Sequence, residues 1–416
     1  MSKLEKLLEG VEVEWKLLEG IVLDKFWIMP ATPKFDENEK IPYITSKNIK
    51  GGNISFDKVK FISQSAYVKI SGNRPIISGD FLISMIGTIG EVAMVKKSDL
   101  SFYGQNMYLL RLNDKIINRR FFLHFFDSPK MKRHFSTVKN NSGQGYLKSK
   151  DIEKLKIPIP CPDNPEKSLK IQKEIVRILD SFTELTTELT TELTTELTAR
   201  KKQYSYYREQ LLTFEESEVK HLPMGDESVG KFIRGGGLQK KDFTESGVGC
   251  IHYGQVYTYY GTYAKKTKTF VSEEFAKKAR IAKYGDLVIA TTSETDEDLC
   301  KAVAWLGNED IAVSSDACFY RHDLNPKYVA YFFQTEQFHK QKRKFITGAK
   351  VRRVNASNLE KIKIPIPSLK EQERIVNILD KFDTLTTSIS EGLPKEIDQR
   401  KKQYEYYREK LLSFPK

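Results

Sequence analysis

The sequence contains no hydrophobic run that approaches the ~20 residues needed to cross a bilayer. Its first ten residues, MSKLEKLLEG, also lack the apolar core of a secretory signal. We therefore expect a cytoplasmic protein with no membrane contact. The composition, 39% hydrophobic and 30% charged over 416 residues, is typical of a folded chain with two or three domains.

Cysteine and histidine are scarce, and neither is spaced for metal binding. The four cysteines, Cys161, Cys250, Cys300 and Cys318, lie far apart and form no CxxC pair, and the six histidines are scattered. This pattern indicates neither a zinc site nor a disulfide framework, so we expect reduced cysteines that serve as packing residues.

Recognisable catalytic and cofactor motifs are also missing. The run Gly225 to Lys231 has the glycine spacing of a phosphate-binding loop, but Phe232 stands where a metal-ligating Ser or Thr is required. No glycine-rich cofactor loop accompanies Asn325-Pro326, where Asn is expected to cap a helix and Pro to begin it. We therefore predict a non-enzyme with no catalytic residue, no metal and no cofactor in this chain.

Acidic residues are absent from two strongly basic segments. Residues 128–150 hold six Lys or Arg and residues 337–359 hold seven, in a chain of net charge +13. A surface facing phosphates explains this bias, because neutralised phosphates release counterions. An ordinary solvated helix face is the alternative interpretation.

These segments and two polar turns provide the candidate contacts to DNA. The turns contain Gly104-Gln105-Asn106 and Ser314-Ser315-Asp316, whose side chains could reach base edges, or could simply form turns. The predicted DNA-binding residues are Gln105, Asn106, Lys132, Arg133, Gln144, Tyr146, Lys148, Lys150, Ser315, Lys342, Arg343, Lys350, Arg352, Arg353 and Asn355.

The most informative feature is an internal repeat. Residues 168–214 reappear without a gap as residues 368–414, with closely matching ends and a different middle. Apolar residues at Ile171, Ile175, Ile178 and Phe182 have the four-three spacing of a coiled-coil seam. Each copy is predicted to be one long helical arm.

The segments before the arms repeat as well. Ser78 to Ile83 aligns with Tyr284 to Ile289, and the run LKIPIP that closes the first segment recurs as IKIPIP. Short β-rich runs separated by Gly and Asn turns indicate strands, followed by a helical pattern. The predicted fold is α+β, with two repeated globular α/β domains joined by two long antiparallel helices in a coiled coil. The predicted boundaries are 1–160 for the first domain with a short N-terminal helical segment, 161–217 for the first helix, 218–367 for the second domain and 368–416 for the second helix.

The middles of the arms differ. Four TELT units from Thr183 to Thr198 replace the heptad by a spacing of four, whereas Gly392 and Pro394 predict a kink or restart in the second arm. Each arm of 47 residues would span roughly 70 Å as a straight helix. An antiparallel pair of such arms would hold the two domains at a fixed separation.

A duplicated domain that closes on IPIP, a long helix with RKKQYxYYRE and a tetrapeptide array together resemble a type I restriction-modification specificity subunit. The resemblance covers the full chain. It implies that each domain reads one half of an asymmetric bipartite sequence in double-stranded DNA, and that the helices set the spacing. It also implies two methyltransferase subunits as partners, and restriction subunits bound through them. S-adenosylmethionine, ATP and Mg²⁺ would then be held by those partners.

The repeated arm ends agree with a partner that binds twice. Arg200 to Glu209 recurs almost unchanged as Arg400 to Glu409, although the domains have diverged. A shared seam accounts for Tyr204 and Tyr207 but less well for the charged residues. The predicted partner-binding residues are Lys201, Lys202, Tyr206, Arg208, Lys401, Lys402, Tyr406 and Arg408. Two other hypotheses remain, a coiled-coil scaffold without sequence-specific DNA binding and a self-contained methyltransferase, and the missing cofactor loop argues against the second.

Overall fold

The computed structural model describes residues 10–72, 74–99, 101–138, 145–388 and 391–414. The chain divides into two compact units, Met1–Glu192 with Ile397–Lys416 (unit 1) and Leu193–Glu396 (unit 2). Each unit therefore combines one of the predicted globular domains with parts of both arms. The predicted N-terminal helical segment falls within residues 1–9, outside the described residues. No helix among the described residues is long and apolar enough to cross a membrane.

The globular part of unit 1 is built on two main sheets, as its β-rich runs predict. One has the strand order β2-β10-β7-β8 and the other β6-β3-β9, with β3 and β9 parallel. Two further pairs, β1-β11 and β4-β5, complete the strands. Their bounds are β1 Val13–Leu17, β2 Val22–Ile28, β3 Ile41–Ile44, β4 Ile49–Lys50, β5 Asn53–Ile54, β6 Lys60–Ile62, β7 Phe81–Ser84, β8 Val92–Met94, β9 Tyr103–Gly104, β10 Met107–Leu112 and β11 Lys156–Pro160.

Helices pack on both faces of the four-stranded sheet, because Phe121 and Phe122 join the core cluster of Phe81 and Ile83, whereas residues 64–71 contribute to the cluster that contains Leu82. The chain then leads into the first arm. Asn118 caps the helix that follows it by accepting a hydrogen bond from Phe121 N at 3.1 Å. Five aromatic or aliphatic side chains of this helix are buried against the sheet. The helices are α2 Gln64–Ser71, α3 Arg119–Phe126, α4 Pro129–Val138, α5 Ser149–Glu153 and α6 Pro165–Leu212.

Unit 2 repeats this plan with a larger main sheet. The strand orders are β13-β22-β18-β20-β15 and β16-β14-β21-β17, with the pairs β12-β24 and β19-β23. The strands are β12 His221–Pro223, β13 Gly230–Arg234, β14 Val248–Ile251, β15 Tyr263–Ala264, β16 Thr269–Val271, β17 Ile281–Ala282, β18 Leu287–Ala290, β19 Thr292–Ser293, β20 Ala302–Trp305, β21 Ile311–Val313, β22 Ala317–His322, β23 Arg352–Arg353 and β24 Lys363–Pro365. The helices of this half of the chain are α7 Tyr253–Thr258, α8 Glu273–Ala276, α9 Pro326–Phe332, α10 Glu336–Arg343, α11 Ala356–Leu359, α12 Leu369–Thr387 and α13 Leu393–Leu411, and α13 belongs to unit 1 from Ile397 onward.

The repeated IPIP runs have a structural explanation that the sequence alone did not provide. In each unit this run forms a strand, β11 or β24, which pairs antiparallel with the strand that opens the domain, β1 or β12. Two-stranded edges tolerate proline, which has no N–H for a second neighbour. The pair closes each globular domain at the point where the chain enters an arm.

A buried ion pair is conserved between the units. In unit 1, Arg111 Nε and Nη2 donate to the two Asp80 oxygens at 2.8 and 2.9 Å. In unit 2, Arg321 donates to Asp286 in the same way, at 3.1 and 2.7 Å. Such bidentate pairs are strong and geometrically selective. Asp80 and Asp286 lie at equivalent positions in the aligned runs Ser78 to Ile83 and Tyr284 to Ile289, so the alignment reflects an equivalent ion pair.

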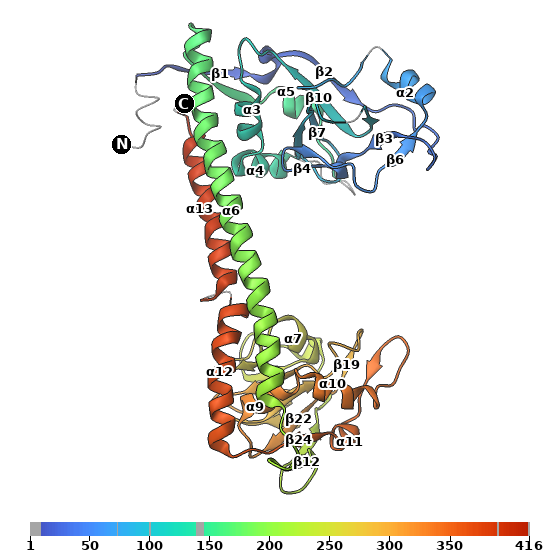
Figure 1. Ribbon diagram of the computed structural model, residues 1–416, viewed down its shortest axis with the longest axis vertical. Helices are drawn as coiled ribbons and strands as arrows, with labels where there is room; N and C mark the ends of the chain where they lie inside the picture. Colours follow the sequence, from blue (N-terminus) through green and yellow to red (C-terminus); the bar gives the residue numbers. More distant parts are fainter. Residues whose placement is uncertain (1–9, 73, 100, 139–144, 389–390, 415–416) are drawn as a thin grey trace. The chain divides into compact units, whose positions relative to one another are not determined.

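The arms lie side by side and antiparallel within each unit (Figure 1). In unit 1, Phe182 of α6 stacks on Tyr407 of α13, and Thr183 meets Tyr404. In unit 2, Tyr204 and Tyr207 of α6 stack on Phe382 of α12. The predicted antiparallel contact is confirmed. The first turns of each arm do more than form a two-helix seam, because buried side chains there join the core of the globular domain: Ile171, Ile175, Val176 and Leu179 in unit 1, and Ile375, Val376 and Leu379 in unit 2.

The second arm is two helices, α12 and α13, rather than the single long helix assigned to residues 368–416. The restart expected at Gly392 and Pro394 is present. A Cβ on Gly392 would lie 2.4 Å from Thr384 O, so a side chain there would collide with the end of α12. Proline at the second position of α13 needs no intrahelical donor, and this permits the new helix to begin.

Candidate nucleic-acid interface

Two polar turns occupy equivalent places in the two units. In unit 1, Met85 N donates to Asn106 O at 3.1 Å, and Met85 O accepts from Leu147 N at 3.0 Å. In unit 2, Thr291 N donates to Asp316 O at 3.0 Å, and its carbonyl accepts from Val354 N at 3.1 Å. In both units, therefore, the backbone of one residue, Met85 or Thr291, joins the polar turn to the basic loop.

In unit 2 this framework gathers predicted DNA-binding residues that are distant in sequence. Ser315, Arg353 and Asn355 line a common pocket of about 310 Å³. The remaining lining residues are Arg234, Thr291, Thr292, Asp316, Ala317, Cys318, Val354, Ala356 and Ser357. Hydrogen-bond donors from Arg and Asn side chains and an acceptor from an Asp side chain line this pocket. Such groups can recognise the hydrogen-bonding pattern of base edges.

The basic loop of unit 2 is held by its own backbone. Thr347 N and Arg353 N donate to each other's carbonyls at 3.0 and 2.9 Å, and β23 pairs with β19. Gly348 has φ +88°, and a Cβ there would lie 2.1 Å from Val351 O. Arg352 donates to Gly348 O at 2.7 Å and forms an ion pair with Asp296 at 2.9 Å. Lys350 and Arg353 are exposed and form no ion pair with a described residue, so the loop presents two cations to a ligand.

In unit 1 the corresponding positions carry different side chains. Gln105 and Asn106 are half-buried, with Gln105 accepting from Tyr43 OH at 3.2 Å and Asn106 at φ +64°. Tyr146 forms a β-bridge with Ile86. Lys148 and Lys150 are exposed. The predicted contact Gln144 lies outside the described residues.

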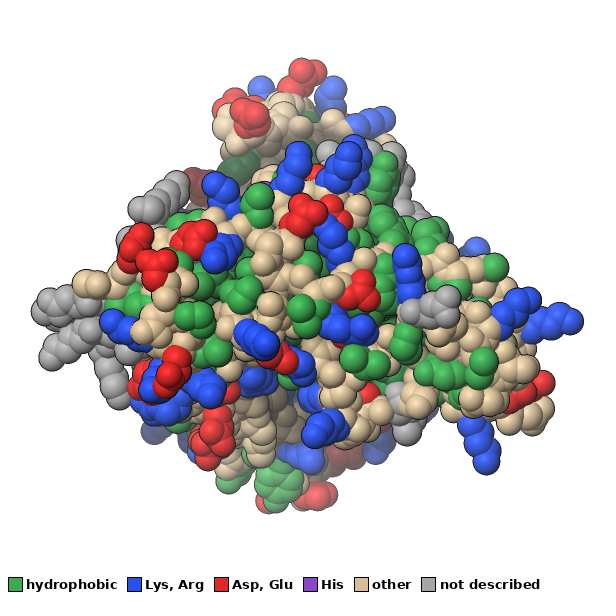
Figure 2. All heavy atoms as spheres, turned by 90° about the horizontal axis from the view of Figure 1, so that it is seen from above, with side chains coloured by type: hydrophobic (Ala, Val, Ile, Leu, Met, Phe, Trp, Pro, Cys, Tyr) green, Lys and Arg blue, Asp and Glu red, His purple; other side chains and the backbone are tan. Residues whose placement is uncertain are grey.

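Three cations of the basic helices form ion pairs on the surface. Lys132 pairs with Asp127 at 2.8 Å, Arg133 pairs with Glu409, and Arg343 pairs with Glu336 at 2.9 Å. Exposed pairs of this kind are weak, so these side chains can exchange partners. On the face drawn in Figure 2, Lys and Arg side chains are interspersed with acidic and hydrophobic ones rather than gathered in a single patch.

The prediction of a DNA contact at Lys342 is wrong. This side chain is 1% exposed, and its Nζ donates to Asp296 O and Leu299 O at 2.8 and 2.7 Å. Burial lowers the pKa of Lys342. The counterpart in unit 1 is Phe135, which is also buried. A lysine within an acid-free run resembled a surface cation, but here it satisfies the carbonyls of a loop.

The repeated ends of the arms present a matching exposed face in each unit. Tyr206 is 60% exposed and Tyr406 is 62% exposed. Each meets its neighbouring tyrosine edge to face, at 5.5 Å between ring centroids. The predicted contacts Lys201, Lys202, Lys401 and Lys402 are exposed beside them.

Arg208 and Arg408 do not belong to that exposed face. Arg208 donates to Gln334 at 3.2 Å. Arg408 is 10% exposed and donates to His124 O and Asp127 Oδ2 at 3.0 and 3.1 Å. Both arginines therefore fasten an arm to the globular part of their own unit. Repetition of a charged residue in the sequence reflected this duplicated internal contact.

Several pocket residues were missed from the sequence, namely Arg234, Thr291, Thr292 and Ser357. A usable signal existed for Thr291, because the alignment of Ser78–Ile83 with Tyr284–Ile289 reaches Met85 and Thr291 two residues later. Arg234 carried no such signal, since it ends a strand far from the basic segment.

Within the described residues, no group of three or more His, Cys, Asp or Glu could hold a metal ion. The four cysteines form no disulfide, and three of them are buried, in agreement with their predicted role in packing. Burial raises the pKa of Cys300 to about 12, so this thiol stays protonated at neutral pH.

Comparison with known proteins gives a consistent family. The profile of the type I restriction modification DNA specificity domain matches this chain twice, over residues 25–199 and 227–399. The specificity subunit of the type I restriction enzyme EcoR124I/EcoR124II from Escherichia coli is 33% identical, covering 100% of this chain and 98% of that protein. A putative type I restriction enzyme specificity subunit from Haemophilus influenzae is also 33% identical, over 99% and 98%.

Solved structures agree with the fold. A chain from a study of assembly and conformational transition in the type I restriction-modification system has a TM-score of 0.68 at 15% identity, covering 96% of this chain and 97% of that one. The HsdS subunit from Thermoanaerobacter tengcongensis has a TM-score of 0.54 at 16% identity, with 96% and 95% covered. With two matching domains and full-length relatives at 33% identity, the chain belongs to the type I restriction-modification DNA specificity family.

Proposed function

We propose that this chain is the DNA sequence-recognition subunit of a type I restriction-modification complex, and that each unit reads one half of an asymmetric bipartite target. The observation that carries the proposal is the duplicated framework around Met85 and Thr291, which presents different side chains at equivalent positions. The aligned pairs are Gln105 and Ser315, Asn106 and Asp316, Tyr146 and Arg353, and Lys148 and Asn355. Two equivalent backbone frameworks that carry different side chains suit a DNA target whose two half-sites differ in sequence.

The chemistry of the unit 2 pocket suggests how it reads bases. A guanidinium such as that of Arg353 can donate two hydrogen bonds to guanine in the major groove, and a carboxylate such as Asp316 accepts from an exocyclic amino group. Exposed cations of the basic segments, among them Lys350 and Lys150, would contact phosphates and contribute affinity without sequence preference.

The test is to replace Arg353 by Ala and determine the methylated sequence in cells, together with DNA affinity. We expect a loss of about 1–3 kcal/mol and relaxed recognition in one half-site, with the other half unchanged. Arg374→Ala removes an exposed arginine from α12 and serves as the matched control. An unchanged target sequence and affinity in Arg353→Ala would refute the assignment of this pocket.

We further propose that two methyltransferase subunits dock on the exposed faces around Tyr206 and Tyr406, and that restriction subunits bind through them. In this scheme S-adenosylmethionine, ATP and Mg²⁺ are held by the partners. Native mass spectrometry of the assembled complex tests the count: Tyr206→Ala and Tyr406→Ala should each remove one methyltransferase subunit, and the double variant both. Full occupancy in the double variant would disprove the site.

The TELT array is proposed to set the spacing between half-sites. Its threonine hydroxyls donate to backbone carbonyls of the preceding helical turn, for example Thr187 Oγ1 to Thr183 O at 2.7 Å. Each TELT repeat therefore extends a regular helix. Deleting Thr195 to Thr198 removes about 6 Å of helix. The methylated sequence should then keep both halves and lose spacer length, whereas an unchanged spacer rules this role out.

A further inference from the structure

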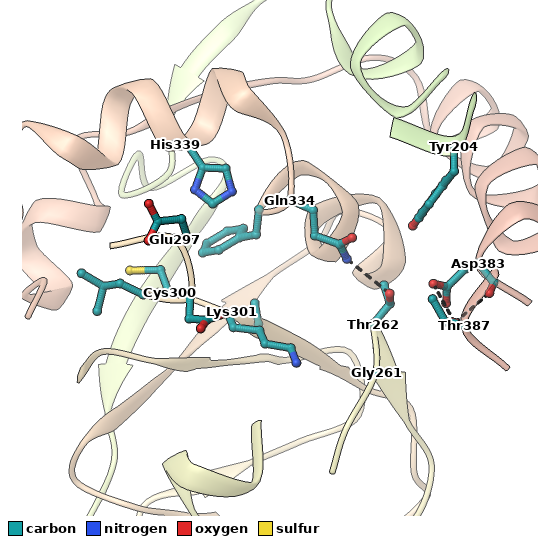
Figure 3. Close-up of a pocket in the computed structure, with 14 residues that line it drawn as sticks. Tyr204, Gly261, Thr262, Glu297, Cys300, Lys301, Gln334, His339, Asp383 and Thr387 are labelled. Carbon is teal, nitrogen blue, oxygen red and sulfur yellow. Dashed lines mark hydrogen bonds between the residues drawn. The ribbon is translucent and has the colours of Figure 1, made fainter. Parts of the chain in front are cut away.

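Unit 2 contains a second pocket, remote in sequence from the basic loop, with a volume of about 430 Å³. It lies among α6, α12, the residues that follow α9, the middle of α10, and the segments at residues 261–262 and 297–302 (Figure 3). This volume falls within the range of roughly 300–1,000 Å³ that is common for small-molecule sites. Nothing in the proposed DNA or methyltransferase contacts uses it.

One polar group in the wall of this pocket is unsatisfied. Tyr204 is 6% exposed, and its hydroxyl has no hydrogen-bond partner among the described residues. Figure 3 shows the hydroxyl directed toward the space between Gln334 and Asp383. In unit 1 the equivalent Tyr404 hydroxyl is hydrogen-bonded to Thr183 Oγ1 at 2.9 Å. A buried hydroxyl without a partner is costly, so its presence points to a missing group.

The residue that corresponds to Thr183 in unit 2 is Asp383, a carboxylate. Its carboxylate accepts a hydrogen bond from the Thr387 hydroxyl at 3.2 Å and interacts with the Thr262 hydroxyl, and it forms no ion pair with any described residue. Lys327 is paired to Asp380 at 2.6 Å, and Arg208 donates to Gln334 while its guanidinium lies 5.2 Å from the centroid of the Tyr204 ring. Burial raises the pKa of Asp383, and the neighbouring Asp380 acts in the same direction.

The rest of the wall has an apolar middle and a second acidic end. Leu299, Ala302 and Phe333 supply the apolar surface, and Glu297 and Asp298 supply two more carboxylates. In Figure 3, Glu297 and Asp383 lie at opposite sides of the set of labelled pocket residues. Lys301 also lines the pocket, but its Nζ donates to Tyr257 O at 3.2 Å.

We propose that this pocket binds a small aliphatic diamine. One ammonium group donates to Asp383 and Tyr204, the alkyl chain contacts Leu299, Ala302 and Phe333, and the second ammonium lies near Glu297 and Asp298. An ammonium has three donors and no acceptor, which suits a site with a free hydroxyl oxygen and a carboxylate. Such a ligand would also give Asp383 a direct ion-pair partner.

The experiment is calorimetric titration of the full-length chain with 1,5-diaminopentane at fixed ionic strength. We expect saturable binding of one equivalent. Asp383→Asn should weaken binding at least tenfold, and Tyr204→Phe, which removes only an unpaired hydroxyl, should weaken it severalfold. Glu373→Gln removes an exposed carboxylate from the same helix outside the pocket and should leave binding unchanged.

Because Asp383→Asn could alter folding, Tyr204→Phe provides an independent measurement, and thermal melts establish that each variant is folded. Pentylamine, which lacks the second ammonium, should bind at least tenfold more weakly than the diamine. Absence of saturable diamine binding to the unaltered chain, or equal binding by folded Asp383→Asn, would overturn the proposal. Equal binding of pentylamine and the diamine would overturn the role of Glu297 and Asp298.

Discussion

The two units share a backbone plan but distribute their buried charges differently where an arm meets its globular domain. In unit 1, Arg408 pairs with Asp127 and also donates to His124 O. In unit 2, the equivalent Arg208 meets the neutral Gln334, and the carboxylate stands on the arm instead, as Asp383. Unit 1 therefore pairs a cation with a carboxylate at this junction, whereas unit 2 leaves the Asp383 carboxylate without an ion pair and the Tyr204 hydroxyl without a hydrogen-bond partner among the described residues.

This difference teaches which contacts the duplicated fold depends on. The pairs Arg111–Asp80 and Arg321–Asp286 are the same in both units, as are the buried amides of Gln172 and Gln372 that accept from Asn118 N and Asn325 N at 2.7 and 2.8 Å. These ion pairs and amide contacts are therefore the same in the two units, whereas the contacts of Arg408 and Arg208 differ.

The largest expected effect comes from the junction arginines. Arg408→Met should destabilise unit 1 by about 3 kcal/mol, because it leaves Asp127 buried with only Lys132 as a cationic partner. Arg208→Met should cost unit 2 about 1 kcal/mol, since it breaks a hydrogen bond to a neutral amide. Hydrogen exchange measured by mass spectrometry assigns each loss to its unit. Equal losses would contradict the described asymmetry.

The next comparison concerns Lys342 and its counterpart Phe135. Lys342→Met should destabilise unit 2 by about 2–3 kcal/mol, because the carbonyls of Asp296 and Leu299 lose a charged donor. Phe135→Met in unit 1 retains an apolar side chain of similar volume and should cost about 1 kcal/mol. Denaturant titration of both variants compares the two, and a cost for Lys342→Met no larger than the control would show the lysine to be dispensable.

Acidification should affect unit 2 more than unit 1. Burial lowers the pKa of His322 and of His339 to about 4, and lowers the pKa of His252. In unit 1 the histidine with a lowered pKa is His124.

A histidine whose pKa is lowered in the folded state contributes its full stabilisation above the pKa of the unfolded state, about 6.5. That stabilisation is lost as the pH falls toward the pKa of the folded state. Between pH 7 and pH 5 we expect unit 2 to lose about 2 kcal/mol more than unit 1. Exchange protection measured at the two pH values checks this, and His322→Gln, which removes one titrating ring, should reduce the difference. Parallel losses in both units would contradict it.

The smallest effect is a gain in stability. Asp383→Thr places in unit 2 the residue that partners tyrosine in unit 1, so Tyr204 should acquire the hydrogen bond that Tyr404 has. We expect a gain of about 0.5–1 kcal/mol. Thermal unfolding without added amine measures it, with Thr183→Ser as the matched change in unit 1. A loss of stability would indicate that Asp383 already has a compensating partner.

Much of the architecture could be predicted because the sequence contains an internal repeat. The alignment of residues 168–214 with 368–414 gave the arms and their antiparallel contact, and the strands followed from β-rich runs between glycine turns. The pocket of unit 2 was predicted in part, since Ser315, Arg353 and Asn355 do meet there. Arg234 was missed because no local pattern marks which strand end lies beside a distant loop.

The errors have one physical origin. Lys342, Arg208 and Arg408 were judged by charge, and charge alone does not distinguish a surface cation from one that satisfies buried carbonyls or fastens an arm. Their long apolar stems allow burial when the charged end finds a partner, and that depends on tertiary structure. Periodicity could have helped, because Lys342 falls on the same helix face as Phe338.

The contribution of the end of the chain to unit 1 has a consequence for biosynthesis. Leu412 and Phe414 belong to the core of unit 1, yet they are synthesised after the whole of unit 2. A ribosome-bound chain can therefore finish unit 2 while the core of unit 1 still lacks these side chains. The globular part of unit 1, although translated first, completes its packing only when α13 emerges and returns to it.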